Sequence, residues 1–393
     1  MKAKIIDYGY NGEGVAKIDG KIYFIPKTII GEEVEFSTTK ENSKFCNAKL
    51  EKITSKSNLR ISPPCKYFDK CGGCCFQHLS YEEEIKIKKM LFLREFCKIQ
   101  KLEDIQFTAC QQEFGYRNKL RLSVKNKDLG FFEEKSKNFL PVENCMLVNN
   151  KLNNLIKKTN HFLKHSSCEF KEVIFYDFDD TYAVDFITDS KDSFTPPQNF
   201  CNILLNHKGQ TVPYRACGLN LEFNGDQFRQ VNNEIAKALY DKVKTEVKNE
   251  KIINAYSGAG LLSALLAQKA DQVYGIELNK SAHLSAEKLK LKNNITNLAN
   301  ICGYAEKELP KYIKKCSCLV VDPPRAGCDK KLIDCILASP PKKIIYISCN
   351  PSTLVRDLKM LKNKYEISGC ELFDMFPKTA NVEALIVFNI LKK

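Results

Sequence analysis

The chain has 393 residues, 44% of them hydrophobic, which is enough to bury at least one large core. At roughly 100 to 200 residues per domain, this length predicts two or three domains. Lys and Arg outnumber Asp and Glu by 61 to 47, a net charge of +14 that favours a polyanionic partner, most naturally nucleic acid. The N-terminal MKAKIIDYGY lacks an apolar signal-peptide core, and no apolar run reaches about 18 residues, so we expect a cytoplasmic protein without a membrane span.

The first predicted unit covers residues 1–58. The sequence GYNGEGVAKIDGKIYFIPKTIIGEEVEF alternates apolar and polar residues between glycines, which predicts a small antiparallel β-barrel. SNLRISPP, residues 57–64, has the composition of a linker out of this barrel.

The second predicted unit, residues 59–222, is a central α+β domain. Ser80 and Glu83 form a capping-box pair ahead of an apolar pattern with helical spacing, which predicts a helix. VIFYDFDDTYAVDFIT, residues 173–188, predicts a hairpin about an Asp-Asp turn. Between them, GYRNKLRLSVKNKDLGFF alternates cations with apolar residues at strand period, the cations being Arg117, Lys119, Arg121, Lys125 and Lys127. By itself this pattern fits an ordinary solvated strand face equally well.

The third predicted unit, residues 223–393, alternates strands with helices. IINAY, VYGIEL, CLVVD and KKIIYIS are apolar strands, and LLSALLAQKA, KSAHLSAEKLKLKNN and KKLIDCILAS are helical stretches. This order predicts an α/β doubly wound, Rossmann-like parallel sheet. The last two apolar segments predict an antiparallel pair that closes it.

A glycine turn follows the first strand of this sheet. Gly258 and Gly260 separate strand from helix, and Glu277 closes the next strand 17 residues after Gly260. Glycines allow close approach of a ligand, and an acid at about this distance suits ribose hydroxyls, so we expect a nucleoside-containing ligand. Ser263 stands where a dinucleotide motif has its third glycine, and no Gly-Lys-Ser/Thr loop is present, so NAD, FAD and ATP are disfavoured.

The sequence Asp322-Pro323-Pro324-Arg325 ends the fourth strand, at the edge where doubly wound sheets bind ligands. Together with the glycine turn it resembles the S-adenosylmethionine-dependent methyltransferase fold. Many nitrogen methyltransferases of that fold carry an aromatic residue where this chain has Arg325. The resemblance therefore implies a different methyl acceptor.

A thiol and a carboxylate are predicted beside this edge. Cys349 ends the fifth strand, and Glu383 begins the last strand, which starts where its parallel neighbours finish because it is antiparallel. Singly, Cys349 is more simply a buried strand cysteine and Glu383 a solvated carboxylate. Jointly they suit one reaction: a thiolate that adds to carbon 6 of uracil activates carbon 5 toward a methyl sulfonium, and a base then removes the carbon 5 proton.

Four motifs in the expected order resemble the family of RNA uracil-5-methyltransferases. They are FRQVN (residues 228–232), DPPRAG (322–327), SCNP (348–351) and FPKTANVE (376–383). The resemblance implies S-adenosylmethionine contacts for Gln230, Tyr256, Glu277 and Asp322, the nucleophile for Cys349 and the proton acceptor for Glu383. Two positions depart from the family: Arg229 replaces an aromatic residue, and Asn381 replaces a frequent histidine.

The chain holds 18 cysteines, and without an export signal most are expected to be reduced core residues. CKYFDKCGGC is different, because Cys65, Cys71 and Cys74 converge within ten residues, which favours metal ligands. Spacing alone leaves zinc and iron–sulfur open. The family resemblance implies a [4Fe-4S] cluster with Cys145, in LPVENCMLV, as fourth ligand. Cys75 is the nearest competitor, but its position next to Cys74 would strain a shared site.

The same resemblance implies that residues 1–58 are similar to a TRAM domain, an RNA-binding barrel of the OB type. The basic strand face then becomes a predicted RNA-contact surface. A paired uracil cannot reach a buried thiol, so we expect an unpaired or flipped uridine. Family members with both cluster and barrel usually modify ribosomal RNA, so the expected substrate is 23S rRNA, methylated by a monomer, with tRNA as the alternative.

Two other classes of protein remain as alternatives. A radical S-adenosylmethionine enzyme also combines a TRAM barrel with an iron–sulfur cluster, but those enzymes use C-x3-C-x2-C, whereas this chain has C-x5-C-x2-C and a fourth cysteine. A non-catalytic RNA-binding protein on a degenerate methyltransferase fold is disfavoured, because the glycine turn, Asp322, Cys349 and Glu383 are all present.

Overall fold

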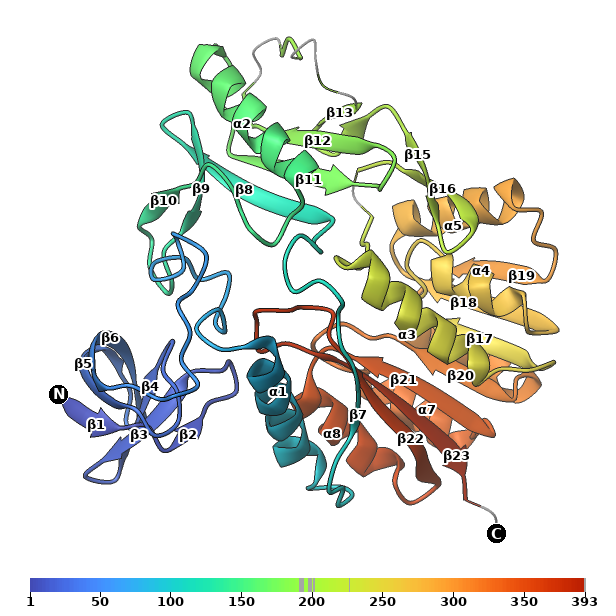
Figure 1. Cartoon of the computed structure of the whole chain (residues 1–393). Helices are drawn as coiled ribbons and strands as arrows, with labels where there is room; N and C mark the ends of the chain where they lie inside the picture. Colours follow the sequence, from blue (N-terminus) through green and yellow to red (C-terminus); the bar gives the residue numbers. More distant parts are fainter. Residues whose placement is uncertain (191–193, 197–199, 201, 226, 392–393) are drawn as a thin grey trace.

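The computed structural model describes residues 1–190, 194–196, 200, 202–225 and 227–391. Within them the chain forms an N-terminal barrel, a central seven-stranded sheet and an eight-stranded sheet flanked by helices (Figure 1). A two-stranded ribbon, β15 (Val212–Ala216) with β16 (Leu219–Phe223), connects the last two parts along the chain.

The N-terminal sheet closes on itself. Its strands are β1 (Lys2–Lys4), β2 (Asp7–Tyr8), β3 (Gly14–Ile18), β4 (Lys21–Ile25), β5 (Glu33–Glu41) and β6 (Phe45–Ser55). The order β1-β5-β6-β4-β3-β2 ends on β1 and β2, which follow each other directly in the chain. Between them, Ile5 N donates to Glu32 O at 2.9 Å and Ile6 N to Val15 O at 2.8 Å. One continuous segment therefore bonds to both ends of the sheet.

The central sheet has the order β10-β9-β8-β11-β12-β13-β14. Its strands are β8 (Lys119–Lys125), β9 (Asp128–Phe132), β10 (Phe139–Pro141), β11 (Glu172–Asp177), β12 (Tyr182–Ile187), β13 (Asn202–Leu205) and β14 (Lys208–Gly209). Helix α2 (Asn150–His165) packs its apolar side against this sheet. The predicted hairpin is confirmed as β11 paired with β12, and the predicted alternation is confirmed by the buried Leu120 and Leu122 of β8.

The eight-stranded sheet has the order β19-β18-β17-β20-β21-β23-β22-β7. Its strands are β17 (Lys251–Ala255), β18 (Gln272–Glu277), β19 (Leu298–Cys302), β20 (Cys318–Val321), β21 (Lys343–Ser348), β22 (Tyr365–Phe373), β23 (Glu383–Ile390) and β7 (Gln106–Thr108). The first five are parallel, and β23 is antiparallel to β21 and β22. The predicted doubly wound sheet with a closing antiparallel pair is therefore confirmed.

Helices cover both faces of this sheet. One face packs against α3 (Asn233–Thr245), α4 (Leu261–Ala267) and α5 (Lys280–Lys292). The other packs against α1 (Tyr81–Phe96), α6 (Ala305–Tyr312), α7 (Lys330–Ala338) and α8 (Pro351–Leu361). The three helices predicted here are confirmed as α4, α5 and α7, and their buried apolar residues form the two cores.

Two elements from the predicted central segment belong to the part of the molecule that contains the eight-stranded sheet: one helix packs on the sheet and one strand pairs with its edge. Helix α1 begins at the predicted cap, where the Ser80 side chain accepts from Glu83 N at 3.3 Å. Its Phe92 and Phe96 lie in the same core as β20, β21 and β23. Strand β7 pairs with β22 in parallel at the sheet edge. The chain thus enters this sheet before it builds the central sheet.

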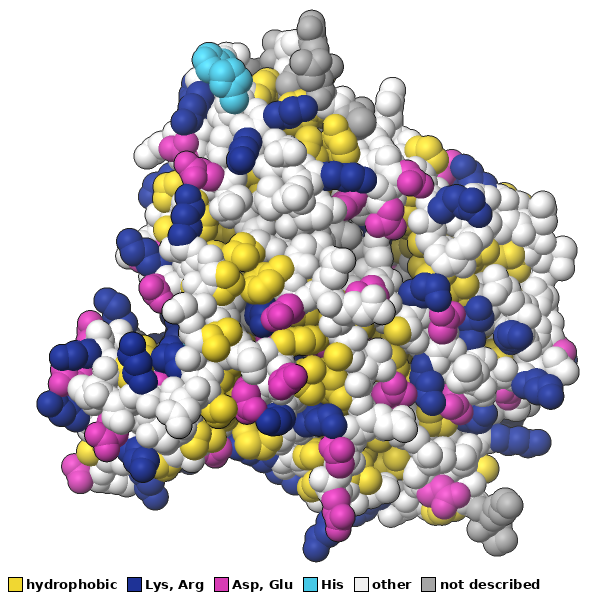
Figure 2. Space-filling model, viewed as in Figure 1, with side chains coloured by type: hydrophobic (Ala, Val, Ile, Leu, Met, Phe, Trp, Pro, Cys, Tyr) yellow, Lys and Arg dark blue, Asp and Glu magenta, His cyan; other side chains and the backbone are white. Residues whose placement is uncertain are grey.

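Charged side chains are spread over the visible face of the molecule. Lys and Arg lie on the barrel and on both larger parts, with Asp and Glu between them (Figure 2). In the part of the chain that the structure describes, no helix is both long and apolar enough to span a bilayer.

Candidate active site

The register of the sheet brings the predicted thiol and acid together. Ser348 is the Cα partner of Ala384 in the antiparallel pair β21–β23, so the next residues outward, Cys349 and Glu383, lie opposite each other. On the other side, Val321 pairs with Tyr346, which puts Asp322 at the same edge. Three residues distant in sequence therefore meet at the carboxyl ends of the parallel strands.

The environment of these groups favours their uncharged forms. Burial and, to a smaller extent, the carboxylate of Glu383 raise the pKa of the Cys349 thiol to about 11, although Arg325 lowers it. Glu383 is only 4% exposed, and burial raises its pKa well above the usual range, with a further increase from Asp322. Burial alone raises the pKa of Asp322 to about 7. Arg325 is the cation that offsets this acidic cluster, a role that sequence reasoning did not assign to it.

The turn after β21 is built to stop the strand and present the thiol. Asn350 caps α8 by accepting from Ser352 N at 3.1 Å, and Pro351 occupies the first helical turn, where no amide donor is needed. The Asn350 side chain also donates to Arg325 O at 2.9 Å. This bond fastens the SCNP turn to the DPPRAG loop, so Cys349 and Arg325 are held side by side.

A cavity of about 460 Å³ lies beside Asp322. Gln230, Tyr256 and Asp322 line it, three of the four residues predicted to contact S-adenosylmethionine. The fourth, Glu277, accepts from Gly258 N at 2.8 Å and so shapes the glycine turn in the cavity wall. The buried Asn254 also lines the cavity, and its Oδ1 has no hydrogen-bond partner. An unpaired buried acceptor is costly, which indicates a polar ligand here.

The backbone of the glycine turn is unusual. Gly258 and Gly260 have φ of +56° and +84°, and Tyr256 has φ of +62°, a conformation rare for an aromatic residue. A Cβ on Gly260 would lie 2.6 Å from Cβ of Ala286, so glycine is required for the close packing of α5 against the turn. Backbone strain of this kind is typical of ligand-binding turns.

Arg229, one of the two departures from the family, replaces an aromatic ring with a planar cation. Its guanidinium lies 4.5 Å from the ring centre of Phe178 and 4.7 Å from that of Tyr214, and Nη1 donates to Asp177 O at 3.1 Å. A guanidinium stacks on aromatic rings as an aromatic side chain does. The guanidinium therefore packs against two aromatic rings, next in sequence to Gln230.

Two further side chains face the acidic cluster. Tyr240, on α3, lines the cavity, and burial raises the pKa of its phenol with contributions from Asp322 and Glu383. Asn381, the second departure, has its Oδ1 3.5 Å from Arg325 Nη2. Sequence reasoning missed Tyr240, since on a helix it has only the spacing of an ordinary core residue.

The four predicted ligand cysteines surround a separate cavity of about 60 Å³, which Cys65, Cys71, Cys74 and Cys145 all line. A single water needs about 10 to 15 Å³, so this space fits a larger group. Burial raises the pKa of Cys74 to about 12 and that of Cys145 to about 11. Among the described residues, no three His, Cys, Asp or Glu side chains are grouped so that they could hold a metal ion.

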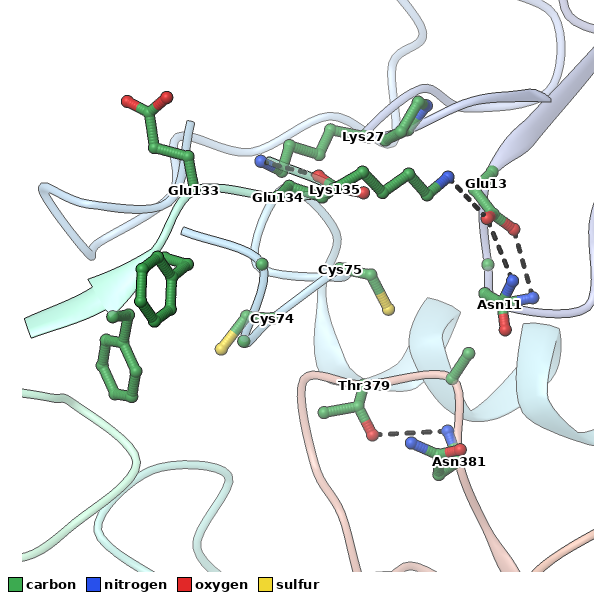
Figure 3. A pocket seen from close by; sticks show the side chains of 17 residues that line it. Asn11, Glu13, Lys27, Cys74, Cys75, Glu133, Glu134, Lys135, Thr379 and Asn381 are labelled. Atoms are coloured by element: carbon green, nitrogen blue, oxygen red, sulfur yellow. Dashed lines mark hydrogen bonds and ion pairs between the residues drawn. The ribbon is translucent and has the colours of Figure 1, made fainter. Parts of the chain in front are cut away.

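Cys75 belongs to a different cavity, which lies between the barrel, the cysteine loop and the loop before β23. Figure 3 shows the side chains of Cys74 and Cys75 leaving the chain in different directions. The amides of Cys75 and Phe76 both donate to Lys378 O, at 2.9 and 3.3 Å. The cysteine loop therefore holds the backbone of the FPKTANVE loop.

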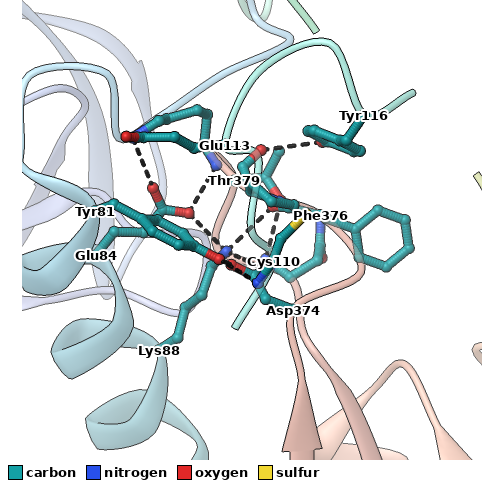
Figure 4. Close-up of polar contacts among 12 residues, drawn as sticks. Tyr81, Glu84, Lys88, Cys110, Glu113, Tyr116, Asp374, Phe376 and Thr379 are labelled. Atoms are coloured by element: carbon teal, nitrogen blue, oxygen red, sulfur yellow. Dashed lines mark hydrogen bonds and ion pairs between the residues drawn. The ribbon is translucent and has the colours of Figure 1, made fainter. Parts of the chain in front are cut away.

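A buried ion network fixes that loop from the other side (Figure 4). Lys88 Nζ, fully buried, donates to Glu84 Oε1 and Asp374 Oδ1, each at 2.7 Å, and to Phe376 O at 3.1 Å. Lys378 N donates to the same Glu84 Oε1 at 2.7 Å. Helix α1 and the cysteine loop thus clamp the segment that leads to Glu383.

Comparison with known proteins agrees with this geometry. A family model described as tRNA (Uracil-5-)-methyltransferase matches residues 197–390. An uncharacterised RNA methyltransferase of Listeria innocua is 31% identical over 99% of this chain and 97% of its own length. The chain belongs to the RNA uracil-5-methyltransferase family. The enzyme transfers a methyl group from S-adenosylmethionine to carbon 5 of a uracil in RNA.

Further relatives support this family assignment. An uncharacterised RNA methyltransferase of Bacillus anthracis is 31% identical over 96% of the enzyme and 94% of the relative. The crystal structure of the Pyrococcus abyssi tRNA (uracil-54, C5)-methyltransferase in complex with S-adenosyl-L-homocysteine superposes with a TM-score of 0.85 at 25% identity, over 99% of each chain. The radical enzyme and the non-catalytic RNA-binding protein considered from the sequence are therefore not retained.

Proposed function

We propose that the enzyme methylates carbon 5 of one unpaired or flipped uridine in 23S rRNA, with Cys349 as the nucleophile and Glu383 as the base. The observation that carries this proposal is the register of β21 and β23, which places the thiol opposite the carboxylate beside the cavity that Asp322 lines.

In the proposed reaction, the Cys349 thiolate forms a bond to carbon 6 of uracil, and the ring electrons move to carbon 5 and oxygen 4. S-adenosylmethionine supplies an electrophilic methyl group on a sulfonium. Carbon 5 takes that methyl group, so the carbon–sulfur bond of the donor breaks and its sulfur keeps the electron pair. Glu383 then removes the carbon 5 proton, carbon 5 and carbon 6 regain their double bond, and the Cys349 sulfur leaves with its electrons.

The environment of Cys349 and Glu383 fits these roles. A thiol with a pKa near 11 is mostly protonated at neutral pH, and a nearby positive charge would favour the thiolate. Arg325 supplies one such charge, and it already lowers the pKa of this thiol against the effect of burial. A buried carboxylate with a raised pKa is a stronger base once ionised, which suits removal of a carbon-bound proton.

For the donor, we propose contacts from Gln230, Tyr256, Glu277 and Asp322. The fit rests on the cavity of about 460 Å³, on the glycine turn and on the unpaired Asn254 Oδ1 in the wall. One carboxylate oxygen of Glu277 accepts a hydrogen bond from Gly258 N and the other accepts one from Asn279 N at 2.7 Å, so these bonds fix the side chain at the turn. Each carboxylate oxygen can accept a second hydrogen bond, as from a ribose hydroxyl.

We also propose that Cys65, Cys71, Cys74 and Cys145 hold a [4Fe-4S] cluster. Four thiols around one cavity are the donor set of such a cluster. Four thiolates can hold either one zinc ion or an iron–sulfur cluster, and the family resemblance is what favours the cluster. Arg117 lines the same cavity, and its charge lowers the pKa of Cys145 against the effect of burial.

The choice of ribosomal RNA rests on the cluster cysteines together with a barrel that resembles a TRAM domain. Transfer RNA is the second candidate, favoured by the superposition on the archaeal enzyme whose described substrate is tRNA uracil-54. Because that superposition covers the barrel as well, the barrel by itself does not separate the two substrates.

The deciding experiment maps 5-methyluridine in 23S rRNA and in tRNA from cells with and without the gene, followed by methylation of each purified RNA by the enzyme in vitro. The proposal expects one ribosomal uridine to lose its methyl group in the deletion strain while tRNA is unchanged. Loss confined to tRNA would replace the proposed substrate with the second candidate.

A further inference from the structure

The barrel contributes a turn to the proposed active site. Residues 9–13, here called the barrel turn, connect β2 to β3 and lie against both catalytic loops. Tyr10 Oη donates to Asn350 Oδ1 at 2.9 Å across 340 positions of sequence. Asn350 directly follows Cys349 and caps α8 with the same oxygen. The barrel therefore has a direct hydrogen bond to the residue beside the proposed nucleophile.

The barrel turn also contacts the loop that leads to Glu383. Gly12 has φ of +80°, and a Cβ there would lie 2.5 Å from the Phe76 ring and 3.3 Å from Cβ of Ala380. Ala380 is part of the FPKTANVE motif. In Figure 3, Asn11 and Glu13 of the turn stand across the same cavity from Thr379 and Asn381. One short turn thus packs on both of the loops that carry the proposed reaction.

Internal hydrogen bonds make the barrel turn rigid. Gly9 N donates to Glu13 O at 2.7 Å, and Gly12 N donates to Gly9 O at 3.0 Å. The Glu13 side chain, largely buried, accepts from Asn11 N at 3.2 Å and from Asn11 Nδ2 at 3.1 Å. A turn with this many bonds holds Tyr10 in one place.

The barrel itself is anchored next to the turn. Arg94 of α1 donates to Tyr8 O at 2.7 Å and pairs with Asp7 at 2.6 Å. Lys135 of the central domain pairs with Glu13 at 3.3 Å. Tyr10 is therefore positioned by contacts from two other parts of the molecule, and its place beside Asn350 does not depend on one exposed hydrogen bond.

Tyr10 combines a bound hydroxyl with an open ring. The residue is 46% exposed, and partial burial raises the pKa of its phenol, whereas a hydrogen bond with Ser352 lowers it. The exposed ring is joined through its hydroxyl to Asn350, which follows the proposed nucleophile in sequence, so it is available to a base that approaches the thiol. Aromatic faces at such places stack on bases, a contact worth about 1–3 kcal/mol.

We propose that Tyr10 completes the active site from the barrel: its hydroxyl fixes Asn350 and so orients Cys349, and its ring stacks on an RNA base that enters beside the thiol. This inference rests on the proposed function of Cys349. It assigns the barrel a direct part in catalysis in addition to any RNA affinity of its surface.

The test compares Tyr10→Phe and Tyr10→Ala with the unmodified enzyme under single-turnover conditions, with RNA dissociation constants measured in parallel. Removal of the hydroxyl alone should slow adduct formation about threefold to tenfold without a change in RNA affinity, because one neutral hydrogen bond is lost. Removal of the ring should in addition weaken RNA binding by about fivefold or more. The rate of covalent adduct formation is followed in the Glu383→Gln background, which separates addition and methyl transfer from product release.

Phe45→Ala is the matched control, since Phe45 is an exposed aromatic residue on β6 of the same barrel and packs on Phe24. It should leave the rate of adduct formation unchanged. The proposal is overturned if Tyr10→Phe forms the adduct at the unmodified rate, or if Phe45→Ala slows it as much as Tyr10→Ala does. Should the enzyme with Tyr10 intact form no adduct at all, the role of Cys349 fails instead, so the two failures are distinct.

Discussion

Two groups of cysteines can be compared within this enzyme: Cys349 at the sheet edge, and the four thiols of the central domain. Burial raises the pKa of the thiol at both places. The surroundings differ, because Cys349 shares its cleft with Glu383, Asp322 and Arg325, whereas the four thiols face one another around a small cavity. Thiol reactivity therefore follows from the neighbouring charges and open space, and burial by itself does not separate a nucleophile from a ligand.

Replacement of cysteine by serine should have different effects at the two places, and the larger effect is expected at the sheet edge. Cys349→Ser should reduce methylation by a factor of about 10⁴ or more, because an alcohol is a far weaker nucleophile than a thiolate. RNA binding and iron content should be unchanged. Radiolabelled methyl transfer, filter binding and iron analysis check the three properties. Near-normal turnover in this variant would remove Cys349 from the reaction.

The ion network of Figure 4 connects the two places, and its loss should affect stability. Lys88→Met would leave Asp374 without its buried cation and Glu84 with only Lys378 Nζ at 3.4 Å, and breaking a buried pair from one side costs about 3–5 kcal/mol. Urea unfolding of the purified protein gives the free energy of unfolding. Lys86→Met is the control, since Lys86 pairs with Glu83 at an exposed position and should change stability by less than about 1 kcal/mol. Equal effects of the two variants would contradict the role given to the network.

In the cysteine loop, Cys65→Ser should lose iron and the associated visible absorbance from protein prepared without oxygen. The thiol chemistry at the sheet edge should persist, with a moderate loss of rate, since the loop donates two backbone hydrogen bonds to Lys378 O. Iron analysis and single-turnover assays on the same sample check both statements. Full iron content in the variant would refute the ligand assignment.

The smallest expected effect concerns the charge on the donor. A thiol with a pKa of about 11 gains thiolate as the pH rises, so alkylation of Cys349 by iodoacetamide should accelerate about tenfold per pH unit between pH 7 and 9. A sulfonium beside Asp322 should favour the thiolate further, by about tenfold at fixed pH. S-adenosylhomocysteine, which is neutral at sulfur, is the control for any protection of Cys349 from iodoacetamide by a bound ligand. Equal rates with the two ligands would show that the donor does not activate the thiol.

The convergence of the three proposed site residues at one sheet edge was predictable because it follows from local rules. Strand ends, a glycine turn and one antiparallel partner suffice to bring Asp322, Cys349 and Glu383 together, and the register of the sheet confirms that they meet. It is harder to predict that two separate loops meet around one cavity, as the loop with Cys65, Cys71 and Cys74 and the loop with Cys145 do. Cys145 was therefore proposed only through the family resemblance.

Long-range docking was not predictable. The contact of Tyr10 with Asn350, the position of Tyr240 and the addition of β7 to the last sheet depend on how separate elements pack, and no spacing in the sequence indicates it. For Arg229, the sequence shows a departure from the family motif, and the structure adds the two aromatic rings on which its guanidinium stacks.

The central claim is that uracil is methylated while it is bound covalently to Cys349, and trapping of this adduct tests the claim most directly. In the Glu383→Gln variant, the uracil bound to Cys349 should accept the methyl group. The product should then stay attached, since the amide cannot remove the carbon 5 proton. Mass spectrometry of the denatured protein after incubation with RNA and S-adenosylmethionine should then show a methylated uridine attached at residue 349, and none in the Cys349→Ser, Glu383→Gln double variant. An adduct that survives in the double variant, or free 5-methyluridine produced by Glu383→Gln at the unmodified rate, would contradict the account.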